Sequence, residues 1–378
     1  MNPLLTLPRV VANTDGVDVG VPSHHGDPLA EQRSMDRSAA VVDRSNREII
    51  AVPGADRLSW LHLLLSQHVS ELPVGAGTEA LVLDLNGRVE HHAVLAHVDE
   101  TVWLDVEPGT SAALLGYLEK MRFWSKVEPR SATEELALLS VLGPSTGAVL
   151  ERAGLVLPAE LYGSVLLPGG GFVRRMPGFG HDAVDLLVPR AEVASWWARL
   201  REAGAAAAGS MAHEALRVGA LRPRLGLDTD ERTIPHEVGW IPSAVHLAKG
   251  CYRGQETVAR VANLGRPPRR LVLLHTDGGD EEPLLPGDPV LLGNGAGGRS
   301  VGRVGTSALH HELGGVALAL VKRSVPVDAE LTAGSAGQPG DDSQLTPVRI
   351  DPDSVPPEDG APPAGRLAQA RAGRLAGR

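Results

Sequence analysis

The chain has 378 residues and 43% of them are hydrophobic, so it is long enough for about two or three domains and apolar enough to bury their cores. Its formal net charge of -10 argues against non-specific nucleic-acid binding, because that role normally needs a basic surface. The single cysteine, Cys251, excludes an intramolecular disulfide and a conventional iron–sulfur cluster held by this chain alone.

The first 38 residues show turn formers and little periodicity, so we predict an N-terminal extension over residues 1–38. They lack the basic and long apolar segments of a signal peptide. No apolar run in the chain approaches the ~20 residues that span a bilayer. We therefore expect a soluble, cytoplasmic protein without a membrane partner.

Strands and helices alternate in the predicted pattern between residues 39 and 265. Asn86-Gly87 is a strong turn signal, and it predicts a β-hairpin over residues 80–95. Helices are predicted where apolar residues fall on one face. The other predicted strands cover residues 39–43, 48–52, 101–106 and 183–188, and the helices cover residues 111–121, 191–203 and 211–218.

Residues 249–260 surround the cysteine with Lys249, Arg253 and Arg260, and glycines stand on both sides of Cys251. Nearby cations favour the thiolate and so lower the pKa of a thiol, which makes Cys251 a candidate reactive group. The alternative is an inert, buried side chain, as most free cysteines are. The residues alone leave both interpretations open, and the stretch after Gly254 could begin a helix or a strand.

Short strands separated by Gly and Pro turns follow Pro267-Pro268, which predicts a small all-β barrel over residues 266–332. Residues 333–378 are rich in Pro, Gly, Asp, Ser and Ala and contain no aromatic residue. Such a composition buries too little apolar surface to order itself, so we predict a disordered tail over residues 333–378.

The run Lys-Gly-Cys-Tyr-Arg-Gly-Gln-Glu at residues 249–256 resembles the K-G-C-[FY]-x-G-Q-E signature of the YgfZ family. These folate-binding proteins are related to the aminomethyltransferase (T-protein) of the glycine cleavage system. The resemblance implies an α+β fold, with two interleaved α/β domains over residues 39–265 and the C-terminal barrel around a central cavity. It also implies tetrahydrofolate or a derivative as cofactor, and a role in assembly or repair of iron–sulfur enzymes. Further similar stretches are Asp43-Arg44-Ser45, Gly54-Ala55-Asp56, Asn86-Gly87-Arg88-Val89 and Lys126-Val127-Glu128.

The same resemblance implies a site. The thiolate of Cys251 would act as nucleophile or transient ligand, stabilised by Lys249 and Arg253. A folate would need an aromatic side chain to stack on its pterin, and arginines to match the carboxylates of its glutamate tail. The predicted folate-binding residues are Arg217, Trp124, Trp240, Asp84, Gly250, Tyr252, Gly254, Gln255 and Glu256.

Two positions depart from the aminomethyltransferase pattern. His91-His92 stand about where that family carries a pair of aspartates, and the stretch Leu216-Arg217-Val218-Gly219 lacks the acidic residue that follows Leu-Arg in that family. Both departures argue against glycine-cleavage chemistry, so we expect an accessory protein rather than an enzyme. Two rival interpretations remain: a tetrahydrofolate-dependent one-carbon transferase with Asp84 or His91 as base, and a tRNA-modification accessory protein.

Three histidine pairs, His24-His25, His91-His92 and His310-His311, raise the question of a metal. Adjacent residues of a strand point to opposite faces, so such a pair makes no local chelate. The chain contains neither Cys-x-x-Cys nor His-Glu-x-x-His spacing. No metal site is predicted.

Overall fold

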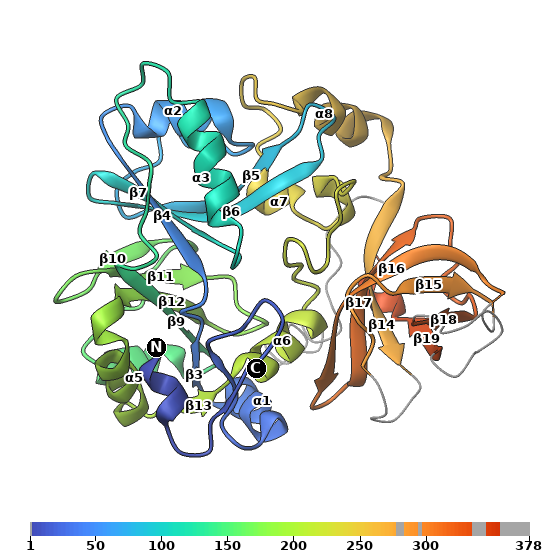
Figure 1. The fold of residues 1–378 in the computed structure, drawn as a ribbon, viewed down its shortest axis with the longest axis horizontal. Coiled ribbons are helices and arrows are strands. Elements are labelled where there is room, and N and C mark those ends of the chain that lie inside the picture. The colour runs from blue at the N-terminus through green and yellow to red at the C-terminus, as the bar shows by residue number, and fades with distance from the viewer. Residues whose placement is uncertain (1, 277–282, 294–296, 335–344, 356–378) are drawn as a thin grey trace, which may run out of the picture. The chain divides into compact units, whose positions relative to one another are not determined.

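The computed structural model describes residues 2–276, 283–293, 297–334 and 345–355 (Figure 1). The chain divides into two compact units. The first consists of Met1–Leu85, Glu90–His213 and Pro242–Gln255. The second consists of Asn86–Val89, Glu214–Ile241 and Glu256–Arg378.

Two large sheets build most of the first unit, and the chain passes between them; β1 and β2 pair as a separate two-stranded sheet. In the six-stranded sheet, the first and last strands in chain order are parallel neighbours and the other neighbours are antiparallel. This sheet has the order β10 (Ser164–Leu166), β11 (Phe172–Met176), β12 (Ala183–Pro189), β9 (Leu136–Leu142), β3 (Ala40–Asp43), β13 (Ala206–Ala208). The five-stranded sheet has the order β5 (Gly77–Leu83), β6 (Val89–Val98), β7 (Thr101–Val106), β4 (Glu48–Pro53), β8 (Arg130–Ser131).

Helices cover the outer face of each sheet (Figure 1). The five-stranded sheet packs on α2 (Arg57–Leu64) and α3 (Ser111–Lys120). The six-stranded sheet packs on α4 (Thr146–Arg152) and α5 (Val193–Glu202), and η2 (Arg190–Glu192) leads into α5. Apolar side chains from both sheets, including Ile49 of β4 and Phe172 of β11, share a third buried cluster between them. The first unit is therefore layered as helix, sheet, sheet, helix.

A network of buried charges lies within this sandwich. Arg174 of β11 is 1% exposed and donates to Asp105 of β7 at 2.5 Å and to Asp185 of β12 at 2.9 Å. Arg47 donates to Asp105 at 2.5 Å and to Glu107 at 2.7 Å. Because Asp105 accepts from both arginines, the network connects the two sheets through paired charges.

The predicted N-terminal extension is an integral part of the first unit. Leu4, in η1 (Pro3–Thr6), joins the same buried cluster as Val41 of β3. Asn2 donates to the Asp43 carboxylate at 2.6 Å. The remaining elements here are β1 (Val11–Ala12), β2 (Pro22–His24) and α1 (Pro28–Arg37).

The second unit contains a closed six-stranded barrel with a core of Val, Leu, Ile and Ala side chains. Its strands close in the order β14 (Arg269–Thr276), β17 (Gly314–Lys322), β16 (Arg299–His310), β15 (Pro289–Leu292), β18 (Leu331–Ala333), β19 (Thr346–Ile350). The 3-10 helices η3 (Pro235–Glu237) and η4 (Pro352–Ser354) also belong to this unit. Three helices cross the sequence division between the units: α6 (Ser210–Gly219), α7 (Ile241–Ala244) and α8 (Gln255–Leu264).

The barrel extends beyond the boundary predicted at residue 332. β19 pairs with both β14 and β18 and so closes the barrel, although it lies in the stretch predicted as a disordered tail. Val348 and Ile350 are buried, which explains why this short segment orders while its surroundings have a tail-like composition. The rest of the predicted tail, residues 335–344 and 356–378, lies outside the described residues.

The predicted fold class is confirmed as a mixed α/β fold with a C-terminal barrel. Within the described residues, no helix is long and apolar enough to cross a membrane.

Candidate functional site

Lys249 fastens the cysteine loop to the end of α2. Its side chain is buried, and its Nζ donates to the carbonyl oxygens of His62, of Leu65 at 2.6 Å and of Gln67 at 3.3 Å. The last carbonyls of a helix have no partner inside it, and a cation there also suits the helix dipole. Burial lowers the pKa of the Lys249 amine to about 8. This amine therefore serves as a cap for α2.

Other hydrogen bonds hold the segment just before the loop to the same stretch of chain. Ser66 donates to the carbonyl of Ala244 at 2.7 Å, and the amide of His246 donates to the carbonyl of Ser66 at 3.0 Å. Gln255, the glutamine of the signature, donates to the carbonyl of Lys249 at 3.3 Å. The loop is thus tied down at its start and closed on itself at its end.

The remaining signature residues are also used within the fold. Arg253 forms an ion pair with Glu90 at 2.8 Å, and Tyr252 is buried with its ring 5.2 Å from Lys249 Nζ. Gly254 has a φ of +81°, a region that favours glycine. Cys251, in contrast, is exposed. The loop therefore presents the thiol to solvent while its neighbours hold the backbone.

This geometry changes the expected roles of the two cations. Sequence reasoning assigned Lys249 and Arg253 to stabilising the Cys251 thiolate. Lys249 donates instead to three carbonyls, and Arg253 pairs with a carboxylate. Both side chains act on the loop by positioning its backbone, because spacing along the sequence does not fix where long side chains point.

Arg217, predicted to bind the folate tail, is buried in a network of the second unit. Its Nε donates to Glu214, one terminal nitrogen donates to Asp228 at 2.8 Å and to the carbonyl of Arg222, and the other donates to Glu214 and to Thr306, both at 2.7 Å. Every N–H of the guanidinium thus has an acceptor. None remains for a folate carboxylate, so the structure argues against that predicted role.

The predicted aromatic and acidic folate contacts lie in different settings. Trp124 is 96% exposed in the turn after α3, whereas Trp240 is 4% exposed. Asp84 is half-buried just after β5. Gly250 and Glu256 are exposed, at the loop and at the start of α8. The structure brings Lys249, Gly250, Cys251, Tyr252, Arg253, Gly254 and Gln255 together in one loop of the first unit.

Sequence reasoning missed Glu79, a carboxylate that is 5% exposed on β5. Glu79 accepts hydrogen bonds from Tyr162 at 2.5 Å and from Ser243 at 3.0 Å, and His92 Nε2 lies 3.3 Å from it. His91, on the same strand as His92, has its pKa lowered by burial. The available signal was an acidic residue in a strand that is otherwise apolar. The cluster gathers a carboxylate, an imidazole and two hydroxyls, which are groups suited to proton transfer.

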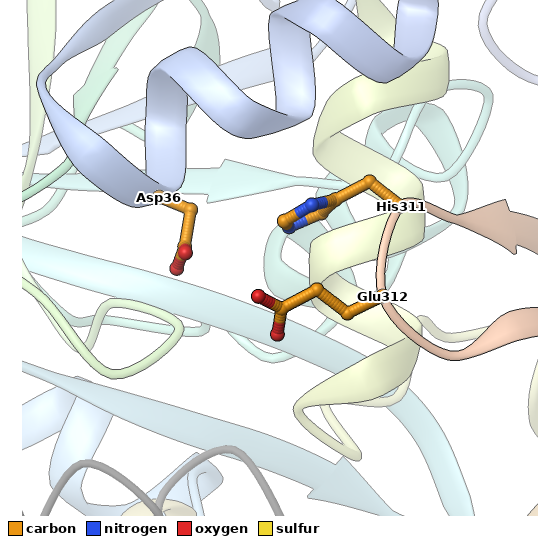
Figure 2. Close-up of side chains that lie close together, drawn as sticks. All are labelled: Asp36, His311 and Glu312. Atoms are coloured by element: carbon orange, nitrogen blue, oxygen red, sulfur yellow. The ribbon is translucent and has the colours of Figure 1, made fainter.

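Figure 2 draws Asp36, His311 and Glu312, side chains of the kinds that ligate metals. Asp36 belongs to α1 in the first unit, whereas the other two follow β16 in the second, so we do not treat them as a site. Taken singly, neither unit gathers three such ligand atoms among its described residues.

Comparisons with known proteins show which sequences this chain resembles. Residues 23–161 match the family model described as the GCVT N-terminal domain. The chain is 28% identical over 235 residues to an aminomethyltransferase of Alcanivorax borkumensis, covering 59% of this chain and 65% of that protein. It is 32% identical over 235 residues to an aminomethyltransferase of Rubrobacter xylanophilus, covering 61% of this chain and 63% of that protein. The chain thus spans less than two thirds of these relatives.

A solved structure shares the fold over most of the chain. The glycine cleavage system aminomethyltransferase T from Bartonella henselae superposes with a TM-score of 0.77 at 20% identity, covering 90% of this chain and 93% of that one. At this identity the likeness shows the fold alone. Together, the matches show similarity to the GCVT N-terminal domain over residues 23–161 and to aminomethyltransferases over about 60% of the chain.

Proposed function

We propose that this protein binds tetrahydrofolate or a derivative, and that its Cys251 loop serves iron–sulfur enzymes in the manner of the YgfZ family. The observation that carries the proposal is the design of the loop. Lys249, Tyr252, Arg253 and Gln255 all hold its backbone, and among the side chains of residues 249–255 only that of Cys251 is exposed. A loop so constrained keeps one thiol in a fixed, accessible position, which suits a nucleophile or a transient ligand.

The GCVT N-terminal domain and the shared fold support the folate part of the proposal. A bound folate would bring a pterin ring and a carboxylate tail. Of the residues predicted to contact the folate, Tyr252 belongs to the loop of the first unit and Trp240 belongs to the second unit, and both side chains are buried. Arg217 has no free N–H, so the tail would require other cations. The chain would supply binding and orientation, and the folate would supply one-carbon chemistry if any is performed.

The direct test titrates the full chain with tetrahydrofolate and follows binding by isothermal titration calorimetry. The proposal predicts saturable binding of one molecule per chain. A parallel titration of Cys251→Ala tests whether the thiol takes part in folate binding. We expect the variant to bind tetrahydrofolate as wild type does, because the thiol is required only for the service to iron–sulfur enzymes. The absence of any binding heat would remove the folate part of the proposal.

A second candidate is a tetrahydrofolate-dependent one-carbon transferase, which the names of the matched relatives suggest. The observation that favours it is the Glu79 carboxylate beside His92, because a carboxylate orients an imidazole for proton transfer. An assay of one-carbon transfer with purified protein separates the candidates: turnover abolished in His92→Gln supports the transferase, and no turnover supports the accessory protein.

The third interpretation, a tRNA-modification accessory protein, rests on no contact in the structure. The net charge of -10 opposes it. Salt-dependent retention on immobilised tRNA would revive it.

A further inference from the structure

His236 carries an unexplained pair of polar atoms in the second unit. It is the middle residue of η3. Both of its ring nitrogens are buried, and neither has a hydrogen-bond partner among the described residues. Buried polar groups in folded proteins nearly always find a partner, so an imidazole with two unpaired nitrogens needs an explanation.

The surroundings of His236 make the exception sharper. Next to it, Glu237 accepts from Arg269 at 2.8 Å through each carboxylate oxygen, and its own oxygen also accepts the amide of Ile234 at 3.1 Å. Arg269 also donates to Asp230 at 2.6 Å. The charged side chains of Glu237, Arg269 and Asp230 therefore have partners, in contrast to the two ring nitrogens of His236.

An unsatisfied buried donor or acceptor costs roughly 1–3 kcal/mol, so two on one ring are a standing loss to the folded protein. Such a loss is tolerated where the groups are reserved for a molecule that binds later. Burial lowers the pKa of His236 to about 4, so the ring is neutral near pH 7. A neutral imidazole offers one donor and one acceptor. This combination suits an uncharged heterocycle better than a carboxylate or a phosphate, which would call for a cation.

We propose that His236 is a ligand-contacting residue, and that one of its ring nitrogens hydrogen-bonds to the pterin ring of a bound folate. This inference rests on the proposed function and assigns one contact within it. The two nitrogens point in diverging directions, so one meets the heterocycle and the other meets a second ligand atom or a water.

The alternative is that ordered water satisfies both nitrogens and no ligand is involved. The two accounts predict different effects of removing the nitrogens. If the two ring nitrogens wait for a ligand, they lower the stability of the free protein and contribute to ligand affinity. Their removal should then raise stability and weaken binding. Water-satisfied groups contribute nothing to affinity.

The test compares wild type, His236→Phe and His236→Gln in the full chain. Thermal unfolding without ligand and calorimetric titration with tetrahydrofolate are measured for each. His236→Phe is expected to raise the Tm by roughly 2–4 °C, because two unpaired groups are lost. It is also expected to weaken tetrahydrofolate binding about tenfold, as the loss of a hydrogen bond inside a site does. His236→Gln keeps a donor and an acceptor and should recover part of the affinity.

His25 supplies the matched control. It is a partly buried histidine with one unpaired ring nitrogen among the described residues, burial lowers its pKa to about 4, and its ring stacks on Trp197 at 5.3 Å. His25→Phe keeps the stacking and should leave tetrahydrofolate affinity unchanged.

The outcomes separate the inference from the function on which it rests. If wild type binds tetrahydrofolate and folded His236→Phe binds it equally well, water is the partner and the inference falls while the proposed function stands. If wild type binds no tetrahydrofolate, both fall. Should His236→Phe fail to fold, His236→Leu, which also lacks both nitrogens, takes its place in the same comparison.

Discussion

The amine of Lys249 takes the place of the hydrogen-bond donors that are missing after the last turn of α2. Three carbonyl oxygens converge on it, and the side chain is only 4% exposed. An ammonium buried in this way serves the backbone and leaves the nearby thiol without a cationic partner from Lys249. In the cysteine loop, the long side chains of Lys249 and Arg253 therefore fix the backbone, and the thiol of Cys251 faces solvent.

Replacing Lys249 by Met keeps most of its volume and removes its three donors. We expect a loss of about 2–3 kcal/mol in the free energy of unfolding, because three buried carbonyls lose their partner. Urea denaturation followed by circular dichroism measures this. Lys322, an exposed lysine that donates to one carbonyl at 3.1 Å, provides the control, and Lys322→Met should cost less than about 0.5 kcal/mol. Equal effects of the two substitutions would contradict the capping role.

His236 predicts a pH dependence whose sign is set by burial. Its folded-state pKa of about 4 lies below the ordinary value of 6.5, so the unfolded chain binds more protons between these values. Protonation of this ring therefore costs the folded state nothing above pH 6.5 and destabilises it progressively as the pH falls from 6.5 toward 4. Relative to wild type, His236→Phe should gain on the order of 1–2 kcal/mol between pH 7 and pH 5. Chemical denaturation at several pH values measures the difference, and a constant difference would show that the ring does not titrate in this way.

At the scale of elements, the two sheets of the first unit are joined by apolar packing and by the buried charges around Arg174. A buried ion pair is seldom a net gain over apolar packing, but breaking one leaves an uncompensated charge. The network therefore specifies how β7, β11 and β12 meet more than it adds to stability.

Arg174→Met should lower the free energy of unfolding by about 3–5 kcal/mol, because Asp105 and Asp185 lose a buried partner. The neighbouring residue on β11 gives an unusually close control. Arg175 forms an ion pair with Asp182 at 2.7 Å, with both side chains about a third exposed (31% and 38%), so Arg175→Met should cost at most about 1 kcal/mol. If the two variants unfold at the same urea concentration, the buried network does not have the assigned role.

Gly305, on β16 of the second unit, packs closely against Asp228. A Cβ added there would lie 2.3 Å from the Asp228 carboxylate, which also accepts from the amide of Thr306 at 2.7 Å and from Arg217. Gly305→Ala should therefore displace Asp228 and lower the Tm by several degrees. Gly116 of α3 has no atom within 4 Å of an added Cβ, and Gly116→Ala should raise stability by about 0.5–1 kcal/mol through helix propensity. A harmless Gly305→Ala would show that Asp228 can move freely.

At the scale of the whole molecule, the sequence predicted the helices and strands that are determined by their own residues. The hairpin of β5 and β6 and the α5 and α6 helices lie where alternation, turn chemistry and helical spacing placed them. β19 was missed because five residues inside a Pro- and Gly-rich stretch carry no signal of their own, and the barrel supplies their partners.

The site was predicted in outline but not in its contacts. The signature located the cysteine loop, whereas the partners of Lys249 lie more than 180 residues away in sequence. Arg217 was predicted to bind a folate carboxylate because the sequence around it does not reveal that its guanidinium donates to Glu214, Asp228 and Thr306. Long polar side chains select their partners in three dimensions, and a single sequence does not record that choice.

We propose that Cys251 serves iron–sulfur enzymes as a reactive thiol. The most direct measurement is the activity of an iron–sulfur enzyme in a strain that lacks this protein, complemented with wild type or with Cys251→Ala at equal protein levels. The account predicts that wild type restores the activity and that Cys251→Ala leaves it near the level of the deficient strain. Full restoration by Cys251→Ala would contradict it.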